Sequence, residues 1–497
     1  MPPLDYTTLS QAQRTHLAQL EERFLVPSST LESVYDHMQE ELQKGLEKPG
    51  QTVAMIPSYV THRITGEEEG EYLAMDLGGT NLRICKVTLL GAGKLKVAQN
   101  KYSVSDALKT GTSKELFDYL AECVDDFLTE RAGRGSRGGP RLDMGFTFSF
   151  PVAQTGIDKG CLVTWTKGYD IQDAVGKDIV QLLQTAINRK HLNVRVAAIV
   201  NDTVGTLLAC AYQAPETFCG VILGTGTNAA YYERLDKITK FDRTLSDRHV
   251  REMILNMEWG AFDSERHVLP FTRYDNKLDR ESINPGKQLF EKMVSGMYLG
   301  EIVRNILVDM VDRRLIFSGN SSPELNHAYT LDTAYLSTIE ADMQDLGLLD
   351  TREVLETILN LPSPTAADIV IVKRVCELVG HRSAKLAASA LSALIRQRQD
   401  LLAPTDPENG GGPGKVMVGI DGSLYEFYPN YERLLLEQMT KLIGPDITSL
   451  VSIKLSKDGS GVGAALTALA ASKTRGSSRG PSRTTTPGVE MIPPGHT

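Results

Sequence analysis

The chain has 497 residues, of which 41% are hydrophobic, so it is long enough to form two lobes that each bury a core. Its formal charge of −9 argues against nucleic acid as the main partner, because the phosphate backbone attracts basic surfaces. No apolar run reaches about 18 residues, and residues 1–20 contain no apolar leader, which argues against a membrane-spanning or secreted protein.

The cysteines are scattered along the chain and form no CxxC pair, a pattern typical of reduced, structural thiols. They are Cys85, Cys123, Cys161, Cys210, Cys219 and Cys376. We therefore expect a cytoplasmic protein that binds neither nucleic acid nor a membrane.

The hydrophobic pattern predicts alternating strands and helices. Residues 8–48 have apolar positions at helical spacing. Residues 72–90 are predicted to form strand, Gly-rich turn and strand, a hairpin whose turn is also a candidate ligand loop. Further strands are predicted at 142–150, 194–200, 415–420 and 450–455, with a second hairpin around Gly224. Helices are predicted at 116–128, 174–188, 203–213, over most of 285–400, and at 429–442 and 462–471.

Two segments lack the apolar residues that a packed element needs. Residues 131–141 are rich in Arg and Gly and are expected to form a solvated basic loop. From Ser472 onward the chain is Ser, Thr, Arg, Pro and Gly, and we expect a disordered tail.

The order strand, turn, strand, followed by strand and helix, occurs from residue 72 and again from about residue 219. This repeated order of elements predicts an α/β protein with two βββαβα-type halves that face each other across a cleft. The Gly-rich turns of both halves would then meet around one ligand.

Four Gly-rich turns are candidates for binding phosphate, because glycine allows close backbone approach and exposed N–H groups attract anions. The first contains an aspartate that could orient Mg²⁺ through water. A plain hairpin turn or a helix cap is the alternative for each, but four in one chain favour a nucleotide. The turns are Asp76–Asn81, Gly224–Asn228, Asp421–Ser423 and Asp458–Gly461.

Asp202 follows the apolar run 194–200, which places a carboxylate at the end of a buried strand. Phosphoryl transfer to an alcohol requires a group that accepts the hydroxyl proton, and Asp202 is the candidate. A capping role before the helix predicted at 203–213 is the alternative. The Asn201-Asp202 dipeptide alone leaves both interpretations open.

Lys167 lies in a polar Thr-Lys-Gly loop just after Trp165. A cation in this loop could stabilise the charge that spreads over a transferred phosphoryl group. An ordinary surface lysine is the alternative.

Glu258 and Glu291 are acidic residues beside large apolar ones, and a partly buried carboxylate requires partners. Sugar hydroxyls can donate to such a carboxylate, whereas pairing with a nearby lysine is the structural alternative. Ser149, in the apolar Phe-Ser-Phe-Pro string, is either a ligand or a satisfied core hydroxyl.

Together these strings resemble the hexokinase family, in the ATP-dependent eukaryotic branch that includes the fungal glucokinases. The resemblance runs from about residue 10 to residue 471. Two positions depart from the usual pattern: Leu82 stands where many members have Phe, and Val462 stands where many have Lys or Arg. The matching strings are Leu77–Asn81, Phe148–Pro151, Trp165–Gly168, Asn201–Gly205, Gly224–Gly226, Asn256–Gly260, Phe290–Met293, Gly419–Tyr425 and Asp458–Gly461.

The resemblance implies an actin-like (ribonuclease H-like) two-lobed ATPase fold with a sugar and ATP cleft between the lobes. It implies ATP-dependent phosphorylation of glucose, and of mannose or fructose to an extent that the sequence leaves open, at the 6-hydroxyl. The implied organisation is an N-terminal helical segment packed on the large lobe (1–66), a small lobe (67–200), a large lobe (201–460), a C-terminal helix returning to the small lobe (461–471) and a tail (472–497).

The resemblance also assigns roles to single residues. Asp202 would be the base and Lys167 would assist it. The hexose would be held by Ser149, Thr166, Lys167, Asn201, Asp202, Asn228, Glu258 and Glu291. ATP would face Asp76, Gly78, Gly79, Thr80, Asn81, Lys101, Gly224, Thr225, Gly422, Ser423, Gly459 and Ser460. Mg²⁺ would arrive on ATP, so no metal-ligating residues are assigned, and the protein would be a monomer or a homodimer.

Two rival functions use the same fold. A catalytically silent or moonlighting glucose sensor would have lost the base, the lysine or a phosphate turn, and all of these are present. An actin-like ATPase with a protein partner would have no need for the polar set around Ser149, Asn201, Glu258 and Glu291. Turnover of ATP without sugar would favour that second rival.

Overall fold

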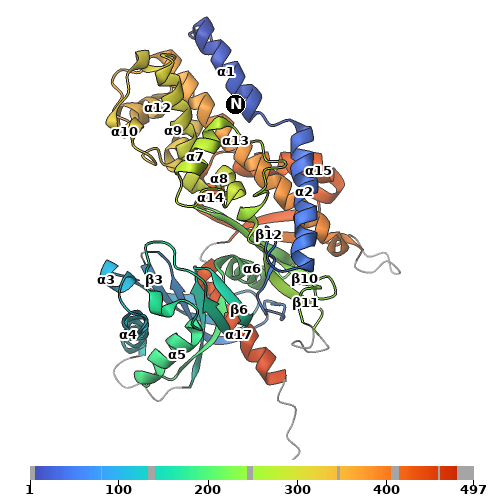
Figure 1. Ribbon diagram of the computed structural model, residues 1–497. Helices are drawn as coiled ribbons and strands as arrows, with labels where there is room; N and C mark the ends of the chain where they lie inside the picture. Colours follow the sequence, from blue (N-terminus) through green and yellow to red (C-terminus); the bar gives the residue numbers. More distant parts are fainter. Residues whose placement is uncertain are drawn as a thin grey trace, which may run out of the picture.

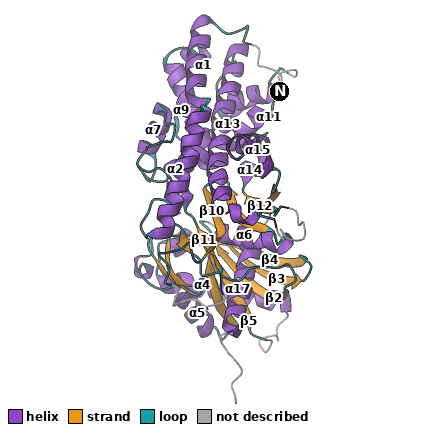
Figure 2. Cartoon of the chain, turned by 90° about the vertical axis from the view of Figure 1, so that its right-hand side faces the viewer, coloured by secondary structure: helices purple, strands orange, loops and turns teal. Residues whose placement is uncertain are grey.

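The computed structural model describes residues 6–79, 81–132, 140–242, 250–343, 347–404, 413–456 and 459–477. Two mixed sheets form the centres of two lobes, and Figure 2 shows the strands gathered in one half of an elongated molecule while helices fill the other. The α/β class expected from the sequence is confirmed.

The small-lobe sheet has the strand order β4-β3-β2-β5-β8. β2, β3 and β4 form an antiparallel meander, and β5 and β8 continue the sheet in parallel with β2. The hairpin expected at 72–90 is therefore confirmed. The strands are β2 (Glu69–Leu77), β3 (Asn81–Leu90), β4 (Leu95–Ser103), β5 (Leu142–Phe148) and β8 (Val194–Val200). A separate hairpin joins β6 (Val152–Gly156) to β7 (Lys159–Leu162).

The large-lobe sheet repeats this topology with the order β11-β10-β9-β12-β13, and β1 is added at its edge. The first three strands are again antiparallel, and the last two again run parallel to the first. The two similar halves expected from the sequence are thus present. The strands are β1 (Ile56–Pro57), β9 (Thr217–Leu223), β10 (Thr227–Arg234), β11 (Glu252–Asn256), β12 (Val416–Asp421) and β13 (Val451–Leu455).

Helices α6 (Asp202–Gln213) and α17 (Gly459–Ser477) pack against each other between the two sheets. α6 lies on the large-lobe sheet and α17 on the small-lobe sheet. Their contact is backbone to backbone: a Cβ built on Gly463 would lie 2.1 Å from the Cα of Gly205. Val462, beside this contact, is 5% exposed and belongs to the core between the lobes.

The helical half of the large lobe is organised around α13 (Ala366–Gln397), a helix of 32 residues that is buried over most of its length. A capping box at Thr365 and Asp368 fixes its start. Helices α1, α2 and α15 pack on it, and Figure 1 shows α1 and α13 extending away from the sheets. The single helical stretch expected at 8–48 is two helices, α1 (Gln11–Phe24) and α2 (Ser28–Glu47), because Pro27 restricts the residue before it and starts α2.

The remaining helices connect these parts. Helices α4 (Ser113–Ala132) and α5 (Ile179–Arg189) cover the small-lobe sheet. The others are α3 (Asp106–Lys109), α7 (Arg273–Glu281), α8 (Leu289–Val294), α9 (Gly296–Asp312), α10 (Pro323–Asn326), α11 (Thr333–Ala341), α12 (Leu349–Glu353), α14 (Ser423–Phe427), α15 (Tyr431–Ile443) and α16 (Pro445–Thr448). Short 3₁₀ turns occur at Gln172–Ala174, Trp259–Ala261, Phe317–Gly319 and Gln399–Leu402, and a π turn at Val354–Ile358.

Two boundaries differ from those expected. α5 begins at Ile179 rather than 174, because Asp178 caps it and 172–174 forms a 3₁₀ turn. α17 continues to Ser477, so the segment expected to be disordered from 472 starts as helix, with the Ser472 hydroxyl bonded back to Ala468. Most of the basic loop expected at 131–141 and the tail beyond Ser477 lie outside the described residues. None of the helices in the described ranges is both long and apolar enough to span a membrane.

Candidate active site

A cleft of about 930 Å³ is lined by residues of both lobes. Every residue expected to hold the hexose lines it: Ser149, Thr166, Lys167, Asn201, Asp202, Asn228, Glu258 and Glu291. These residues come from six separate segments of the chain, so only the folded protein brings them together.

Asp202 enters the cleft where strand β8 ends and helix α6 begins. The N-cap of α6 is Asn201, whose side-chain oxygen accepts the backbone N–H of Thr203 at 2.9 Å. Asp202 is the first residue of the helix, and its Oδ1 accepts the same N–H at 2.8 Å. The capping position therefore belongs to Asn201, and the Asp202 carboxylate is directed to the cleft.

Burial raises the pKa of the Asp202 carboxyl above its ordinary value. The positive charge of Lys167 acts in the opposite direction, whereas the negative charge of Asp76 adds to the rise. The net shift is upward, which makes Asp202 a better proton acceptor than an exposed aspartate.

An aromatic cluster supports the small-lobe wall of the cleft. The rings of Trp165 and Tyr169 stack with centroids 5.3 Å apart, and the Trp165 indole donates to the carbonyl of Ile171 at 2.7 Å. Phe148 and Phe150 pack against Trp165. This packing explains why small polar residues in the Phe-Ser-Phe-Pro and Trp-Thr-Lys-Gly strings alternate with aromatic ones: the rings fix the backbone that presents the polar groups.

The first Gly-rich turn touches the loop that carries Lys167. A Cβ on Gly79 would lie 3.2 Å from the Cβ of Lys167, and the Tyr169 hydroxyl donates to the Gly78 carbonyl at 3.3 Å. The lysine Nζ lies 5.5 Å from the Phe150 ring centroid. The turn and the lysine are thus neighbours at the mouth of the cleft.

The large-lobe wall is a network of carboxylates and amides. Glu258 Oε1 accepts from Asn256 at 2.7 Å and from Asn228 at 3.2 Å, and the Asn228 oxygen accepts the Glu258 backbone N–H at 3.0 Å. Glu291 accepts the backbone N–H of Thr227 at 3.0 Å. Both glutamates are thereby oriented by donors on strands β10 and β11.

Burial raises the pKa of both Glu258 and Glu291 above the ordinary value, and the nearby charge of Asp202 adds to each rise. These three carboxylates share the cleft with a fourth, Asp421, and with one lysine among its lining residues. Hydroxyl groups that donate to these carboxylates would compensate for the burial, which fits a polyhydroxylated ligand.

Three residues of the cleft have left-handed backbone although none is glycine: Lys167 (φ 57°), Glu258 (φ 56°) and Gln288 (φ 53°). This conformation costs on the order of 1 kcal/mol per residue and persists only where surrounding contacts enforce it. Such strain is concentrated at functional sites.

The turns of the large lobe meet at the other end of the cleft. A Cβ on Gly422 would lie 2.3 Å from the carbonyl oxygen of Leu223, and its own φ is 127°, so glycine is required there. The turn after β9 and the turn after β12 are thus in contact. Gly224, Thr225, Gly422, Ser423 and Ser460 all line the cleft, as expected from the sequence.

A second cavity of about 750 Å³ shares Thr225, Met297 and Ser423 with the cleft. Its walls combine apolar surface, including the exposed ring of Phe427, with hydroxyl and carboxyl groups on α11 and the turn before it. The sequence interpretation did not include this cavity. Its polar walls are formed by Asp332, Thr333, Ser337 and Thr338.

Other residues assigned to ATP lie beside the cleft rather than in its lining. Asp76 is held by Arg83 at 2.9 Å and by the Ser460 hydroxyl at 2.9 Å. Lys101 is exposed on edge strand β4, paired with Arg83 in the sheet, and the structure does not bring it to the cleft. Gly78, Gly79, Asn81 and Gly459 are near these groups without lining the cleft, and Thr80 is outside the described residues.

Sequence reasoning missed several polar residues of the cleft lining, among them Gln154, Asn256, Gln288 and Asp421. Asn256 and Asp421 lie inside strings that were recognised, so the strings contained a signal that was not used. Gln288 stands three residues before Glu291, and its buried Oε1 has no hydrogen-bond partner among the described residues. That acceptor is available to a ligand.

Two sequence profiles described as hexokinase match residues 218–470 and 16–212. The chain is 40% identical over 502 residues to the glucokinase of Aspergillus niger, which covers 94% of this chain and 98% of that protein. It is 40% identical over 459 residues to hexokinase-1 of Schizosaccharomyces pombe, covering 92% of this chain and 91% of that protein.

Among solved structures, the hexokinase of Schistosoma mansoni in complex with glucose matches with a TM-score of 0.80 at 38% identity, covering 93% of this chain and 99% of that chain. Two lobes with the same strand order around a polar cleft define the class, an actin-like sugar kinase fold. Within that class, the chain belongs to the hexokinase family, which confirms the resemblance stated from its motifs.

Proposed function

We propose that this protein transfers the γ-phosphoryl group of ATP to the 6-hydroxyl of glucose, the first step of glycolysis, with Asp202 as the general base. The observation that carries the proposal is the convergence of Asp202, Lys167 and two buried glutamates on one cleft. Membership of the hexokinase family supports the same reaction.

The sugar is held by groups that match its hydroxyls. Glu258 and Glu291 accept hydroxyl protons, and the amides of Asn201 and Asn228 both donate and accept. Ser149 and Thr166 contact the sugar from the small lobe. Gln288 adds an acceptor, because its unpartnered Oε1 is buried in the same wall.

The nucleotide occupies the far end of the cleft. Gly224, Thr225, Gly422, Ser423 and Ser460 present backbone N–H and hydroxyl groups to the phosphates. The adjoining cavity, with the Phe427 ring and a row of hydroxyls, fits a nucleoside, because a base stacks on apolar surface and a ribose forms hydrogen bonds. Mg²⁺ enters on ATP and neutralises the charge of its phosphates.

In the reaction, the 6-hydroxyl proton passes to the Asp202 carboxylate as the oxygen attacks the γ-phosphorus. The new O–P bond forms, the bond to the β-phosphate oxygen breaks, and ADP leaves. Lys167 stabilises the charge on the transferred group. Closure of the two lobes on glucose would exclude water, a competing nucleophile, and align the three reacting groups.

The decisive experiment compares phosphorylation of glucose and of fructose by ATP, with ATP hydrolysis in the absence of sugar as a control. D202N is expected to fold, bind glucose and lose at least about 10²-fold in kcat, the range of general base catalysis. D350N, an exposed aspartate on α12, is the matched control and should keep full turnover.

Near-normal turnover by D202N would remove Asp202 from its role. Glucose binding without turnover by the wild type would indicate a sensor, and ATP hydrolysis independent of sugar would indicate an actin-like ATPase. Comparable turnover of glucose and fructose would make the enzyme a broad hexokinase rather than a glucokinase.

A further inference from the structure

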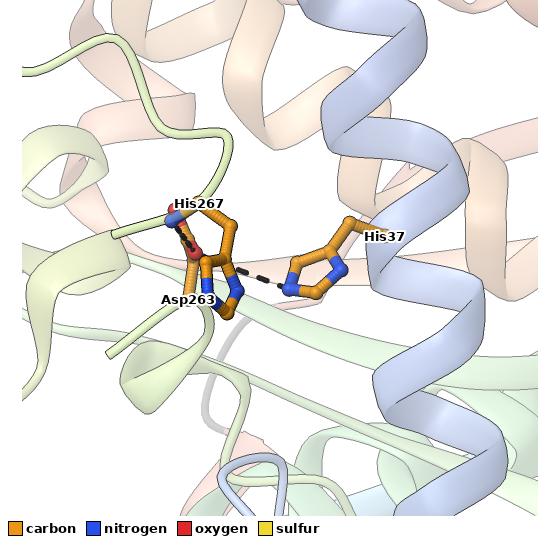
Figure 3. A group of neighbouring side chains, drawn as sticks. All are labelled: His37, Asp263 and His267. Carbon is orange, nitrogen blue, oxygen red and sulfur yellow. Dashed lines mark hydrogen bonds and ion pairs between the residues drawn. The ribbon is translucent and has the colours of Figure 1, made fainter. Parts of the chain in front are cut away.

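A cluster of two histidines and several carboxylates lies outside the cleft, where helix α2 meets the loop after the Trp259–Ala261 turn. Figure 3 shows His37 projecting from α2 towards Asp263 and His267 of that loop. One potential ligand atom from each of these three residues lies within 4.8 Å of the others. No step of the proposed reaction uses them.

Glu41 adjoins the cluster from the helix side. It stands one turn after His37 on the same face of α2, and its Oε1 lies 3.2 Å from the Nε2 of His37. The residue is only 8% exposed, and its Oε2 has no hydrogen-bond partner among the described residues. The buried Oε2 therefore has unused hydrogen-bonding capacity beside His37, although Glu41 is not one of the three residues whose ligand atoms lie within 4.8 Å of one another.

The hydrogen bonds of His37 fix which of its nitrogens faces the cluster. Its Nδ1 is 3.3 Å from Glu40 on the outer side of the helix. Its Nε2 is buried and has no hydrogen-bond partner in the described part of the chain, although carboxylate oxygens of Glu41 and Asp263 lie 3.2 and 3.9 Å away. If Nδ1 donates to Glu40, the Nε2 lone pair faces oxygen lone pairs, an arrangement that a cation between them would relieve.

Glu40 contacts one nitrogen of His37, and the other nitrogen, Nε2, faces the cluster. Carboxylates orient metal-binding imidazoles in this same arrangement. Asp263 is equally well oriented: its Oδ1 accepts the N–H of His267 at 2.6 Å, and its Oδ2 accepts the N–H groups of Val268 and Leu269. Its side chain is fully buried, so these bonds hold it in one position.

We propose a binding site for a divalent transition-metal ion, with Zn²⁺ as the best fit, formed by His37, Glu41, Asp263 and His267. Two imidazoles and two carboxylates are a ligand set that suits Zn²⁺ rather than Mg²⁺ or Ca²⁺, which prefer oxygen alone. Tetrahedral Zn²⁺ holds its ligand atoms about 3.4 Å apart, so separations of up to 4.8 Å shorten by up to about 1.4 Å on binding. The imidazole of His267 is 54% exposed, and its Nε2 lies 3.5 Å from the exposed carboxylate of Glu265, a contact that would have to yield for that movement.

The bound ion would fasten the N-terminal helix to the large lobe. Asp263 and His267 follow the turn that begins directly after Glu258, so the same loop joins the metal site to the sugar wall. The role is structural, because the cluster is not part of the cleft lining. Occupancy should therefore raise stability while leaving the sequence of chemical steps unchanged.

The test uses the full-length protein without an affinity tag, treated with a chelator and then titrated with Zn²⁺ against a chromophoric competitor. Co²⁺ serves as a spectroscopic substitute. We expect one tightly bound ion, and a thermal unfolding midpoint that rises by about 5 °C at hundredfold excess over Kd. H267Q should weaken binding at least about tenfold and abolish the thermal shift.

H327Q removes an exposed histidine elsewhere and is the matched control, with binding like that of the wild type. H37Q and E41Q should weaken binding in the same way as H267Q. If H37Q fails to fold, H267Q decides the question, because its side chain is half exposed.

Three results would overturn the proposal. They are wild-type binding no tighter than about 100 μM, unchanged binding in H267Q, and a Co²⁺ complex with sulfur-to-metal charge-transfer absorption, which would assign the ion to cysteine. Because the readouts are metal binding and thermal stability, failure here is distinct from failure of the proposed catalytic activity.

Discussion

Replacement of Gly463 by alanine tests the contact that joins helices α6 and α17 between the lobes. The added Cβ would lie 2.1 Å from the Cα of Gly205, and 2.2 and 2.3 Å from its carbonyl oxygen and carbon. Carbon atoms ordinarily separate by about 3.5 Å, so the overlap is about 1.4 Å. All three opposing atoms are backbone, so no side-chain rotation can relieve it and the helices must move apart.

Two contributions of opposite sign set the size of the effect. Alanine in place of glycine favours the helix by about 1 kcal/mol. Overpacking of a well-packed core costs about 1–3 kcal/mol, and the upper end applies where only backbone can yield. We expect a net loss of about 2 kcal/mol, which lowers the unfolding midpoint by about 4–8 °C for a lobe of roughly 200 residues that unfolds as a unit.

The same displacement should reduce activity. The N-terminal ends of α6 and α17 carry Asp202 and Ser460 at the cleft. A misplacement of about 1 Å in a catalytic group costs on the order of 10²-fold in rate. G463A should therefore lose both stability and kcat, while the glucose contacts of the large-lobe wall remain.

G461A is the matched control, because it lies two residues away on the same helix. Among the described residues, a Cβ on Gly461 would meet only the sulfur of Cys85 within 4 Å, at 3.2 Å. Thermal unfolding and steady-state kinetics of both variants provide the comparison. If G463A is as stable and as active as G461A, the backbone contact does not position the lobes and the reasoning is wrong.

Four further predictions concern the cleft. K167M should reduce kcat by about 10²–10³-fold and move the acid limb of the kcat/KM pH profile upward, because the lysine charge lowers the pKa of Asp202. D76N should move that limb downward, because the Asp76 charge raises the same pKa. Q288L should raise the KM for glucose by about tenfold with little loss of stability, since its buried Oε1 has no partner to lose among the described residues. E258Q should weaken glucose binding, yet it should raise the unfolding midpoint at pH 8. Burial raises the pKa of Glu258 in the folded state, so the stability that the protonated carboxyl contributes at low pH is lost as the pH rises through that pKa. Glutamine carries no charge and avoids that loss.

Each of these predictions has an outcome that contradicts it. Acid limbs that shift in the same direction in K167M and D76N would show that at least one of the two charges does not act through Asp202. An unchanged glucose KM in Q288L would place Gln288 outside the sugar site. A lower midpoint for E258Q than for wild type at pH 8 would mean that its hydrogen bonds to Asn256 and Asn228 outweigh the cost of burying its charge.

Much of the fold could be predicted locally. Strand β8 was predicted with its observed bounds, and the hairpins of β2–β3 and β9–β10 were placed correctly, because apolar runs broken by Gly-rich turns are properties of neighbouring residues. The break between α1 and α2 was missed although Pro27 was visible in the sequence, because the apolar spacing continues across it.

The candidate site was only partly predictable for a related reason. Residues inside distinctive strings, such as Asp202, Glu258 and Glu291, were identified from their immediate neighbours. Gln288 was not, because its surroundings are ordinary and its unpartnered oxygen exists only after folding. Lys101 was assigned to ATP by resemblance; the register of β3 and β4 places it exposed at the sheet edge, outside the cleft lining, and its role stays a prediction.

The sequence by itself thus determined the elements, the repeated order of the two halves and the strings that carry the chemistry, since these depend on patterns within about ten residues. Tertiary structure alone decided how far those strings are from one another. It brought Gly205 against Gly463, Gly79 against Lys167 and His37 beside Asp263, pairs separated by 258, 88 and 226 positions in the chain. Such contacts arise from the packing of whole elements, and no local pattern encodes them.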